Sequence, residues 1–229
     1  MEKTFEQNKN WIYKAVILLS INGGFVNSIT FESFFHNPVG YVTGNITFAA
    51  LYLADMQTLN FIDVIGAIGG FLLGSILSGL IIPHNYYHRD SKYNLAFIIE
   101  ACLLFLGMLG LIAQIPTSKY LLAVALGLQN GCITHYGKSM IRTTHMTGTT
   151  TDLGILIAHK LIKHYDVPIW RLLIRLFLLL GFFIGSVFGI IAYKTIGYYG
   201  LILSVIICVI MLKLNIAKVL TNKLLQDNI

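Results

Sequence analysis

Residues 62–82 read IDVIGAIGGFLLGSILSGLII, a stretch of 21 residues in which Asp63 is the only charged side chain. A helix of about 20 apolar residues is long enough to cross the hydrocarbon core of a bilayer. Further apolar, nearly uncharged runs occupy residues 16–26, 95–112, 174–192 and 201–212. The sequence therefore predicts an all-α polytopic membrane protein whose surroundings are a lipid bilayer.

The composition supports this class. Hydrophobic residues make up 56% of the chain and charged residues 11%, whereas soluble domains average about 25% charged residues. The net charge of +6 comes from Lys and Arg at the ends of apolar runs, without a basic stripe interleaved with aromatic residues. Such a surplus reports membrane orientation, so we expect no nucleic-acid partner. The three cysteines lie in apolar segments without metal-ligand spacing, and we expect neither disulfides nor metals.

Eight helical segments are predicted, and two of them are short. The short segments, 43–54 and 147–161, are amphipathic, and each begins with a Thr-Gly pair. Polar, broken chain precedes both, at 37–40 and 136–139. About 12 helical residues extend only ~18 Å, which is less than the ~30 Å core. The other six predicted segments are 11–29, 62–82, 94–112, 120–133, 169–193 and 199–214.

The two halves of the chain resemble each other. The Thr-Gly pairs lie 104 residues apart, and the same offset places Gly23 on Gly127 and Val42 on Met146. Residues 70–75, GFLLGS, match residues 181–186, GFFIGS, at an offset of 111. We therefore predict one integral membrane domain made of two repeats, residues 1–115 and 116–229.

The distribution of cations distinguishes two topologies. If both short segments are re-entrant and the N-terminus is inside, 14 Lys and Arg residues lie on the cytoplasmic side, and only Lys119 and Lys194 lie outside. If both short segments cross, the split is 10 to 6 or 11 to 5. The positive-inside rule favours six transmembrane helices plus two re-entrant half-helices, arranged as two inverted three-helix repeats. Both termini would then be cytoplasmic.

The starts of the short helices are the first candidate site: Thr43, Gly44 and Asn45, with Thr147, Gly148 and Thr149. A threonine can serve as N-cap, and the following glycine permits close approach by backbone or ligand. If both helices begin near the midplane, their free N–H groups favour an anionic or electron-rich group. The alternative is that each Thr-Gly pair only starts a packed amphipathic helix.

Polar residues nearby complete the candidate site, each with an alternative role. Asn27 and Asn130 either line a polar path or join helices by hydrogen bonds. Arg142, with His145 before the second short helix, either contacts an anion or anchors the chain at the cytoplasmic face.

Two acidic residues are also candidates. Glu100 lies inside an apolar segment, where an acidic residue is costly; it is either functional or paired near the interface. Asp152 would complement the helix start in the pattern Thr149-x-x-Asp152.

Glycines at four-residue spacing form two ridges, Gly66, Gly70 and Gly74 in one segment and Gly181, Gly185 and Gly189 in another. Small residues at this spacing allow helices to approach closely. The packing partner could be the other repeat or a second protomer in a homo-oligomer. No catalytic or cofactor-binding motif stands out, so we expect no enzyme activity and no cofactor.

Two motifs carry a family resemblance: residues 42–45, VTGN, and residues 127–130, GLQN, followed by residues 142–149, RTTHMTGT. They resemble the YoaK family, bacterial membrane proteins with the domain of unknown function 1275. The resemblance implies a six-helix inner-membrane protein, described as a small-molecule transporter without an established substrate.

The leading hypothesis is a membrane transporter or channel for a small anionic or polar solute, bound at the midplane where the two Thr-Gly starts converge. A scaffold or assembly factor that packs partner helices through the glycine ridges is the alternative. A lipid-modifying membrane enzyme using His145 and Asp152 is a third hypothesis.

Overall fold

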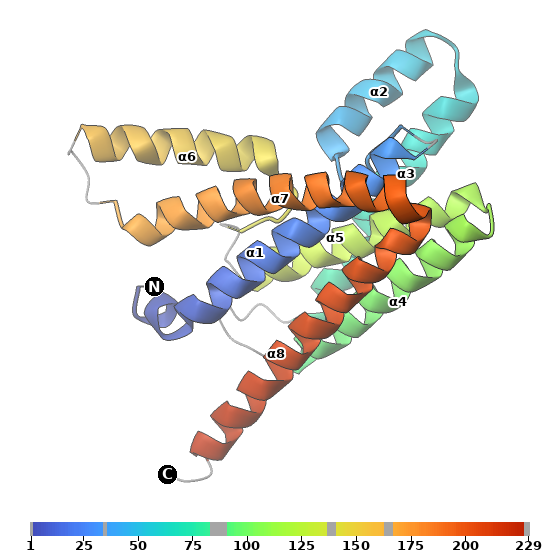
Figure 1. Ribbon diagram of the computed structural model, residues 1–229. Coiled ribbons are helices and arrows are strands. Elements are labelled where there is room, and N and C mark those ends of the chain that lie inside the picture. Colours follow the sequence, from blue (N-terminus) through green and yellow to red (C-terminus); the bar gives the residue numbers. More distant parts are fainter. Residues whose placement is uncertain (1, 34–35, 83–90, 137–140, 163–166, 227–229) are drawn as a thin grey trace.

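The computed structural model describes residues 2–33, 36–82, 91–136, 141–162 and 167–226, and these contain only helices, turns and irregular chain. Each of the eight predicted segments coincides with one α-helix (Figure 1), so the all-α prediction is confirmed. The first and last helices extend well beyond their predicted ends. The helices are α1 (Glu2–Glu32), α2 (Val42–Ala54), α3 (Thr58–Ile81), α4 (Lys92–Ile112), α5 (Lys119–Tyr136), α6 (Met146–Leu161), α7 (Ile169–Ile196) and α8 (Ile202–Gln226).

Four stretches are long and apolar enough to cross a membrane: Lys9–Glu32, Thr58–Ile81, Lys92–Ile112 and Ile169–Ala217. The last stretch contains both α7 and α8, between which the chain turns at Gly197 with φ +61°. Many large apolar side chains on these helices point outwards; Leu72 and Phe183 are 59% and 66% exposed. Contiguous apolar surface of this kind indicates a membrane-embedded protein.

Helix α5 is not among those stretches because its sequence is less apolar, and its surroundings explain how it can be so. Most of its described residues are buried and none is exposed, with Leu122, Leu126 and Leu128 fully covered. The helix packs against α3 and α4. Because α5 contacts protein along most of its surface, it can carry Gln129 and Asn130 without exposing them to lipid.

The two glycine ridges are packing surfaces within this chain. The ridge on α7 lies against α1, and the ridge on α3 lies against α5. A Cβ atom at Gly185 would lie 2.1 Å from the carbonyl oxygen of Ile21, and one at Gly74 would lie 2.0 Å from that of Val124. The hydrophobic effect does not drive helices together within lipid, so the van der Waals contacts made at this close approach stabilise the packing. Both ridges are therefore occupied by helices of the same chain.

The packed helices have defined relative directions. Gly181 contacts Ile17 and Gly185 contacts Ile21, so α7 and α1 run in the same direction. The contacts of α3 advance along α5 in the same way.

Helices α4 and α8 run in opposite directions (Figure 1). Asn215, far along α8, donates a 2.8 Å hydrogen bond to Asn94 at the start of α4. This antiparallel pair closes the bundle on the side away from α2 and α6.

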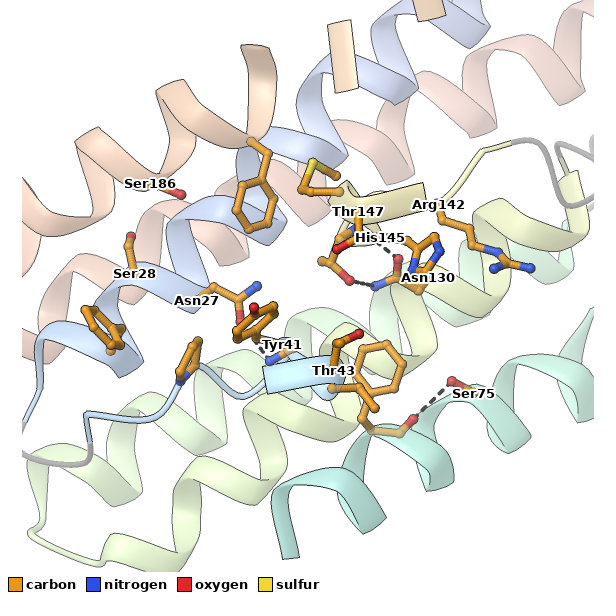
Figure 2. Close-up of a pocket in the computed structure, with 18 of the residues that line it drawn as sticks. Asn27, Ser28, Tyr41, Thr43, Ser75, Asn130, Arg142, His145, Thr147 and Ser186 are labelled. Carbon is orange, nitrogen blue, oxygen red and sulfur yellow. Dashed lines mark hydrogen bonds between the residues drawn. The ribbon is translucent and has the colours of Figure 1, made fainter. Parts of the chain in front are cut away.

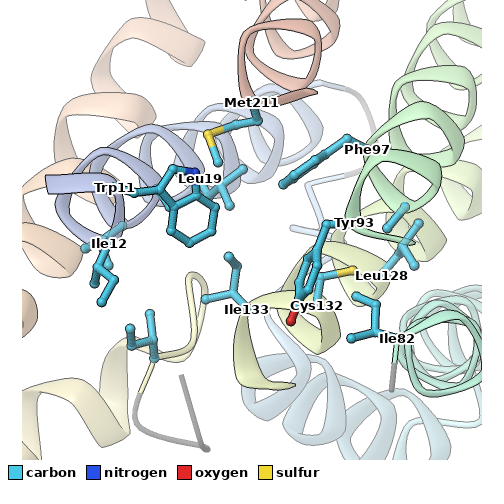
Figure 3. Packing of buried hydrophobic residues seen from close by; sticks show 14 of the residues in the cluster. Trp11, Ile12, Leu19, Ile82, Tyr93, Phe97, Leu128, Cys132, Ile133 and Met211 are labelled. Carbon is cyan, nitrogen blue, oxygen red and sulfur yellow. The ribbon is translucent and has the colours of Figure 1, made fainter. Parts of the chain in front are cut away.

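Two clusters of buried apolar side chains fill the bundle. In the first (Figure 3), side chains from α1, α4, α5 and α8 meet, among them Leu19, Phe97, Leu128 and Met211. The second cluster lies toward the turn between α7 and α8 and includes Leu126. These clusters fix α1 and α5 at the centre, where they carry the polar residues of the site.

Among the helices that the structure describes, α2 packs only on α3 and α6 only on α7. They have 13 and 16 residues, or about 20 and 24 Å of helix. Their first residues lie near the middle of the bundle and their last residues lie away from it (Figure 1). This places both helix starts beside the same interior space.

Candidate functional site

A cavity of about 650 Å³ lies between the starts of α2 and α6 (Figure 2). Its walls come from α1, α3, α5 and α7 and from the chain that precedes each short helix. Several of its residues are exposed, including Tyr41, Arg142 and His145, so it opens to the molecular surface. The volume lies within the range of small-molecule pockets.

The cavity is lined by matching residues from the two halves of the chain. Asn27 matches Asn130 at a spacing of 103, Thr43 matches Thr147 at 104, and Phe71 matches Phe182 at 111. The other matched lining residues are Ser28 and Gly131, Phe31 and Thr134, Gly40 and Thr144, Tyr41 and His145, Val42 and Met146, and Ser75 and Ser186.

The contacts shift the sequence alignment by one residue within α1 and α5. The Cβ site of Gly24 lies 2.1 Å from the carbonyl oxygen of Phe182, and that of Gly127 lies 2.0 Å from that of Phe71. Gly24, and not Gly23, is thus the counterpart of Gly127. The stretch from Gly127 on α5 to the start of α6 is therefore one residue longer than the stretch from Gly24 on α1 to the start of α2.

Asn27 and Asn130 hold the chain that enters each short helix. The Gly40 N–H donates a 2.7 Å bond to Asn27 Oδ1, and the Thr144 N–H donates a 3.1 Å bond to Asn130 Oδ1. Asn27 lies five residues before the end of α1, so the chain has returned about 7.5 Å along that helix by Gly40. Residues 137–140, part of the corresponding second stretch, lie outside the described residues. Asn27 and Asn130 thus each join a long helix to the chain that enters a short helix, and each also lines the cavity.

The prediction that Thr43 and Thr147 are N-caps is wrong. Helix α2 begins at Val42 with Tyr41 as N-cap, and α6 begins at Met146 with His145 as N-cap. Neither N-cap makes a side-chain hydrogen bond to its helix. The asparagine bonds to the preceding chain fix the entry, which a capping hydroxyl would otherwise do.

The glycines of the Thr-Gly pairs leave space for the side-chain rings of these N-cap residues. A Cβ atom at Gly44 would lie 1.9 Å from the Tyr41 ring, and one at Gly148 would lie 2.4 Å from the His145 ring. Each ring therefore folds back over the first turn of its own helix. Neither Gly44 nor Gly148 lines the cavity.

Thr43 and Thr147 face the cavity, whereas Asn45 and Thr149 lie behind it. The buried Asn45 side chain donates a 3.1 Å bond to the Pro38 carbonyl oxygen. The Thr149 hydroxyl donates a 2.9 Å bond to the His145 carbonyl oxygen. These two residues thus support the helix starts and do not border the space.

The electrostatic character of the cavity is positive. Arg142, His145 and His135 line it, and among its described lining residues there is no Asp or Glu. The unpaired N–H groups of the first turns of α2 and α6 add partial positive charge. The arrangement is suited to an anion or to a group with exposed lone pairs.

The expected capping role of Asp152 is wrong. It is the seventh residue of α6, too far along the helix to complement its start, and its carboxylate pairs with Arg175 of α7 at 3.4 Å. Asp152 does not line the cavity.

Glu100 also lies away from the cavity, deep in the bundle. It is 1% exposed, and its carboxyl accepts a 3.2 Å bond from Asn22 Nδ2. Asn22 Nδ2 also donates to Gln129 Oε1 at 2.8 Å. The residue predicted as a solute ligand is thus linked to the site only through other side chains.

Sequence reasoning missed the aromatic and hydroxyl walls of the cavity. Phe71 and Phe182 face it, as do Ser75 and Ser186. The two hydroxyls also tie helices together, since Ser75 donates to the Gly127 carbonyl and Ser186 to the Gly24 carbonyl, each at 3.3 Å. The signal is present in the matching GFLLGS and GFFIGS stretches, which we interpret from the sequence only as evidence of the repeat and as packing surfaces.

Comparison with known proteins gives a family and little more. No curated protein matches the chain, and no solved structure does. One family model, described as "Protein of unknown function (DUF1275)", matches residues 15–214. That span contains the whole cavity and all but the ends of the helical bundle. The domain of unknown function 1275 predicted from the two motifs is thereby confirmed: the chain belongs to the DUF1275 family of proteins of unknown function.

Proposed function

We propose that this chain is a membrane transporter or channel for a small anionic or polar solute, which binds in the cavity between the starts of α2 and α6. The observation that carries the proposal is the paired lining of that cavity by Asn27 and Asn130, Thr43 and Thr147. Transporters built from inverted repeats bind their solutes where broken helices of the two repeats meet.

The proposed topology has six crossing helices and two re-entrant ones, in two inverted repeats. Helix directions support it. If α6 crossed the membrane, α4 and α8 would be parallel, yet they are antiparallel. With α6 re-entrant, the parallel packing of α1 and α7 requires that α2 also does not cross. Helix α5, buried by its neighbours, is then the sixth crossing helix.

Ion pairs support the same topology. Lys194, at the end of α7, pairs with Glu32 at the end of α1 at 3.2 Å. Lys119, at the start of α5, pairs with Asp63 near the start of α3. All four positions fall on the outer side if both termini are cytoplasmic, as expected for an inner-membrane protein. Arg89, Lys138 and Lys163, which also entered the charge argument, lie outside the described residues.

The lining suggests the kind of solute. Arg142 and the helix starts would bind an anionic or strongly polar group, and the asparagine amides would orient it. Phe71 and Phe182 would cover an apolar body. We therefore favour a small organic anion over a bare inorganic ion. The scaffold alternative has no support from the glycine ridges, which are occupied within the chain.

The test is uptake by purified protein in proteoliposomes, with a panel of labelled small carboxylates, inorganic anions and neutral polar metabolites. Thr147→Trp should fill the cavity and abolish uptake of any solute that the unsubstituted protein carries. Thr150→Trp is the matched control, since Thr150 is exposed on the same helix and does not line the cavity. Arg142→Gln should reduce uptake of anions more than uptake of neutral solutes.

Two results would refute the proposal. One is the absence of uptake for every member of the panel by correctly folded protein. The other is equal uptake by Thr147→Trp and Thr150→Trp, because blocking the cavity would then make no difference.

A further inference from the structure

We propose that Glu100 is a proton-binding site coupled to the cavity, and that its protonation reverses the direction of a buried hydrogen-bond chain ending at Asn130. This inference deepens the proposed function by giving the solute site a coupling ion. It rests on the proposed function only in taking the cavity as the place where a solute binds.

The chain of hydrogen bonds is continuous from Glu100 to the cavity wall. Gln129 Nε2 donates to Thr143 Oγ1 at 2.7 Å, and Thr143 Oγ1 donates to Asn130 Oδ1 at 3.3 Å. Asn130 Nδ2 in turn donates to Thr144 Oγ1 at 3.0 Å. Asn130 and Thr144 line the cavity, and Thr144 directly precedes His145, the N-cap of α6. From Asn22 onward, every donor points toward the cavity.

The surroundings of Glu100 favour a change of protonation rather than a permanent charge. The carboxyl lies eight residues into α4, about 12 Å from its start. Among the residues that the structure describes, no Lys, Arg or His pairs with it. The groups that face it are Asn22 from α1, the Cys132 thiol from α5 and the Cys208 thiol from α8. A charge held here without a cation is costly, and one proton taken from the aqueous phase removes it.

Protonation changes what the carboxyl can bond. A carboxylate only accepts, and it accepts from Asn22 Nδ2. The neutral acid carries an O–H donor, and the acceptor on the same amide is Asn22 Oδ1, which is buried and has no hydrogen-bond partner among the described residues. To accept a hydrogen bond from the protonated carboxyl, the Asn22 amide must rotate so that its oxygen takes the place of its nitrogen. That oxygen would then face Gln129 Oε1, which is also an acceptor, so the Gln129 amide must rotate as well.

The turn of Gln129 carries the change to the cavity. Its oxygen would then face Thr143 Oγ1, which would donate to Gln129 and cease to donate to Asn130. Gln129 Nε2 also donates a 2.9 Å bond to the Leu19 carbonyl oxygen, which holds the present direction. The two directions are therefore separate states, and the pH selects between them.

The experiment measures the cavity wall directly and requires no transported solute. Thr147→Cys is introduced with Cys102→Ser, because Cys102 is the exposed native thiol. The rate of labelling by a hydrophilic methanethiosulfonate is measured in nanodiscs between about pH 5 and pH 9, in this protein and with Glu100→Gln. The ratio of the two rates cancels the intrinsic pH dependence of the thiol.

We expect this ratio to change at least about fivefold across the pH range, the lower end of typical coupling between sites. Gln129→Leu, which interrupts the chain and leaves Glu100 in place, should label with the same pH profile as Glu100→Gln. Asp152→Asn removes a carboxylate from α6, the helix that carries the labelled position 147, but leaves Glu100 in place. It should therefore label with the same pH profile as the protein that retains Glu100 and Asp152.

A ratio that stays constant with pH would overturn the proposal, and so would a Gln129→Leu protein with the profile of the Glu100 protein. The second comparison remains decisive if Glu100→Gln does not fold. A failure of solute uptake would refute the proposed function without altering these labelling rates, so the two failures are distinguishable.

Discussion

Replacing Gly185 with alanine should force apart the two helices on which the core of the bundle depends. The added methyl group would lie 2.1 Å from the carbonyl oxygen of Ile21, on the facing side of α1. The obstacle is backbone, which cannot rotate aside as a flexible side chain can. Real Cβ contacts do not fall below 3.0 Å, so α1 and α7 must separate by at least about 0.9 Å, the difference between the two distances.

The size of the effect follows from that separation. A gap of about 0.5–1 Å forfeits a quarter to a half of each dispersion contact along the interface. Overpacking of this kind costs about 1–3 kcal/mol, against which alanine gains up to about 1 kcal/mol in helix propensity. A net loss of about 1 kcal/mol should lower the melting temperature by about 2–4 °C for a chain of this length.

Thermal unfolding of the purified protein in a mild detergent measures this shift. Gly154→Ala is the matched control, because a Cβ atom there has no neighbour within 4 Å, and its melting temperature should stay constant or rise slightly. Gly74→Ala should cost as much as Gly185→Ala, since its methyl would lie 2.0 Å from the Val124 carbonyl oxygen. Equal melting temperatures for Gly185→Ala and Gly154→Ala would refute the reasoning.

Three further predictions concern polar and ring contacts. Asp63→Asn removes the carboxylate that pairs with the buried Lys119 ammonium; because Asp63 is itself partly exposed, the change should destabilise the protein by about 1–3 kcal/mol, measured as a lower unfolding midpoint; an unchanged midpoint would contradict it. Asn130→Leu removes the acceptor of the Thr144 N–H and should cost about 1–3 kcal/mol in the same assay; an unchanged unfolding midpoint would contradict the role of this bond. Gly44→Ala should be destabilising alone and nearly neutral together with Tyr41→Ala, since the Tyr41 ring is the obstacle; additive costs in this double-mutant cycle would exclude the contact.

Much of the fold could be predicted because membrane helices leave strong local signals. Apolar length identified the long helices, and the short lengths of 43–54 and 147–161 separated α2 and α6 from them. The repeated Thr-Gly pairs directed attention to the starts of these helices, where the cavity lies. Six predicted site residues line that cavity: Asn27, Thr43, Asn130, Arg142, His145 and Thr147.

The individual roles were harder to predict because they depend on contacts between distant segments. Nothing local reveals that Asp152 reaches Arg175 on the next helix. Glu100 was recognisable as unusual, but its link to Asn22 joins residues 78 positions apart.

The sequence by itself determined that the chain is helical and suited to a bilayer, because apolar length and the spacing of charges are properties of each segment alone. It also contained the pairing of its two halves, since related segments keep related letters. Only the tertiary structure decided the direction in which each helix runs past its neighbours, the one-residue shift that pairs Gly24 with Gly127, and the use of Asn27 and Asn130 to hold the entering chain. These features are fixed by close approach between different segments of the folded chain, and no local pattern records which atoms will meet.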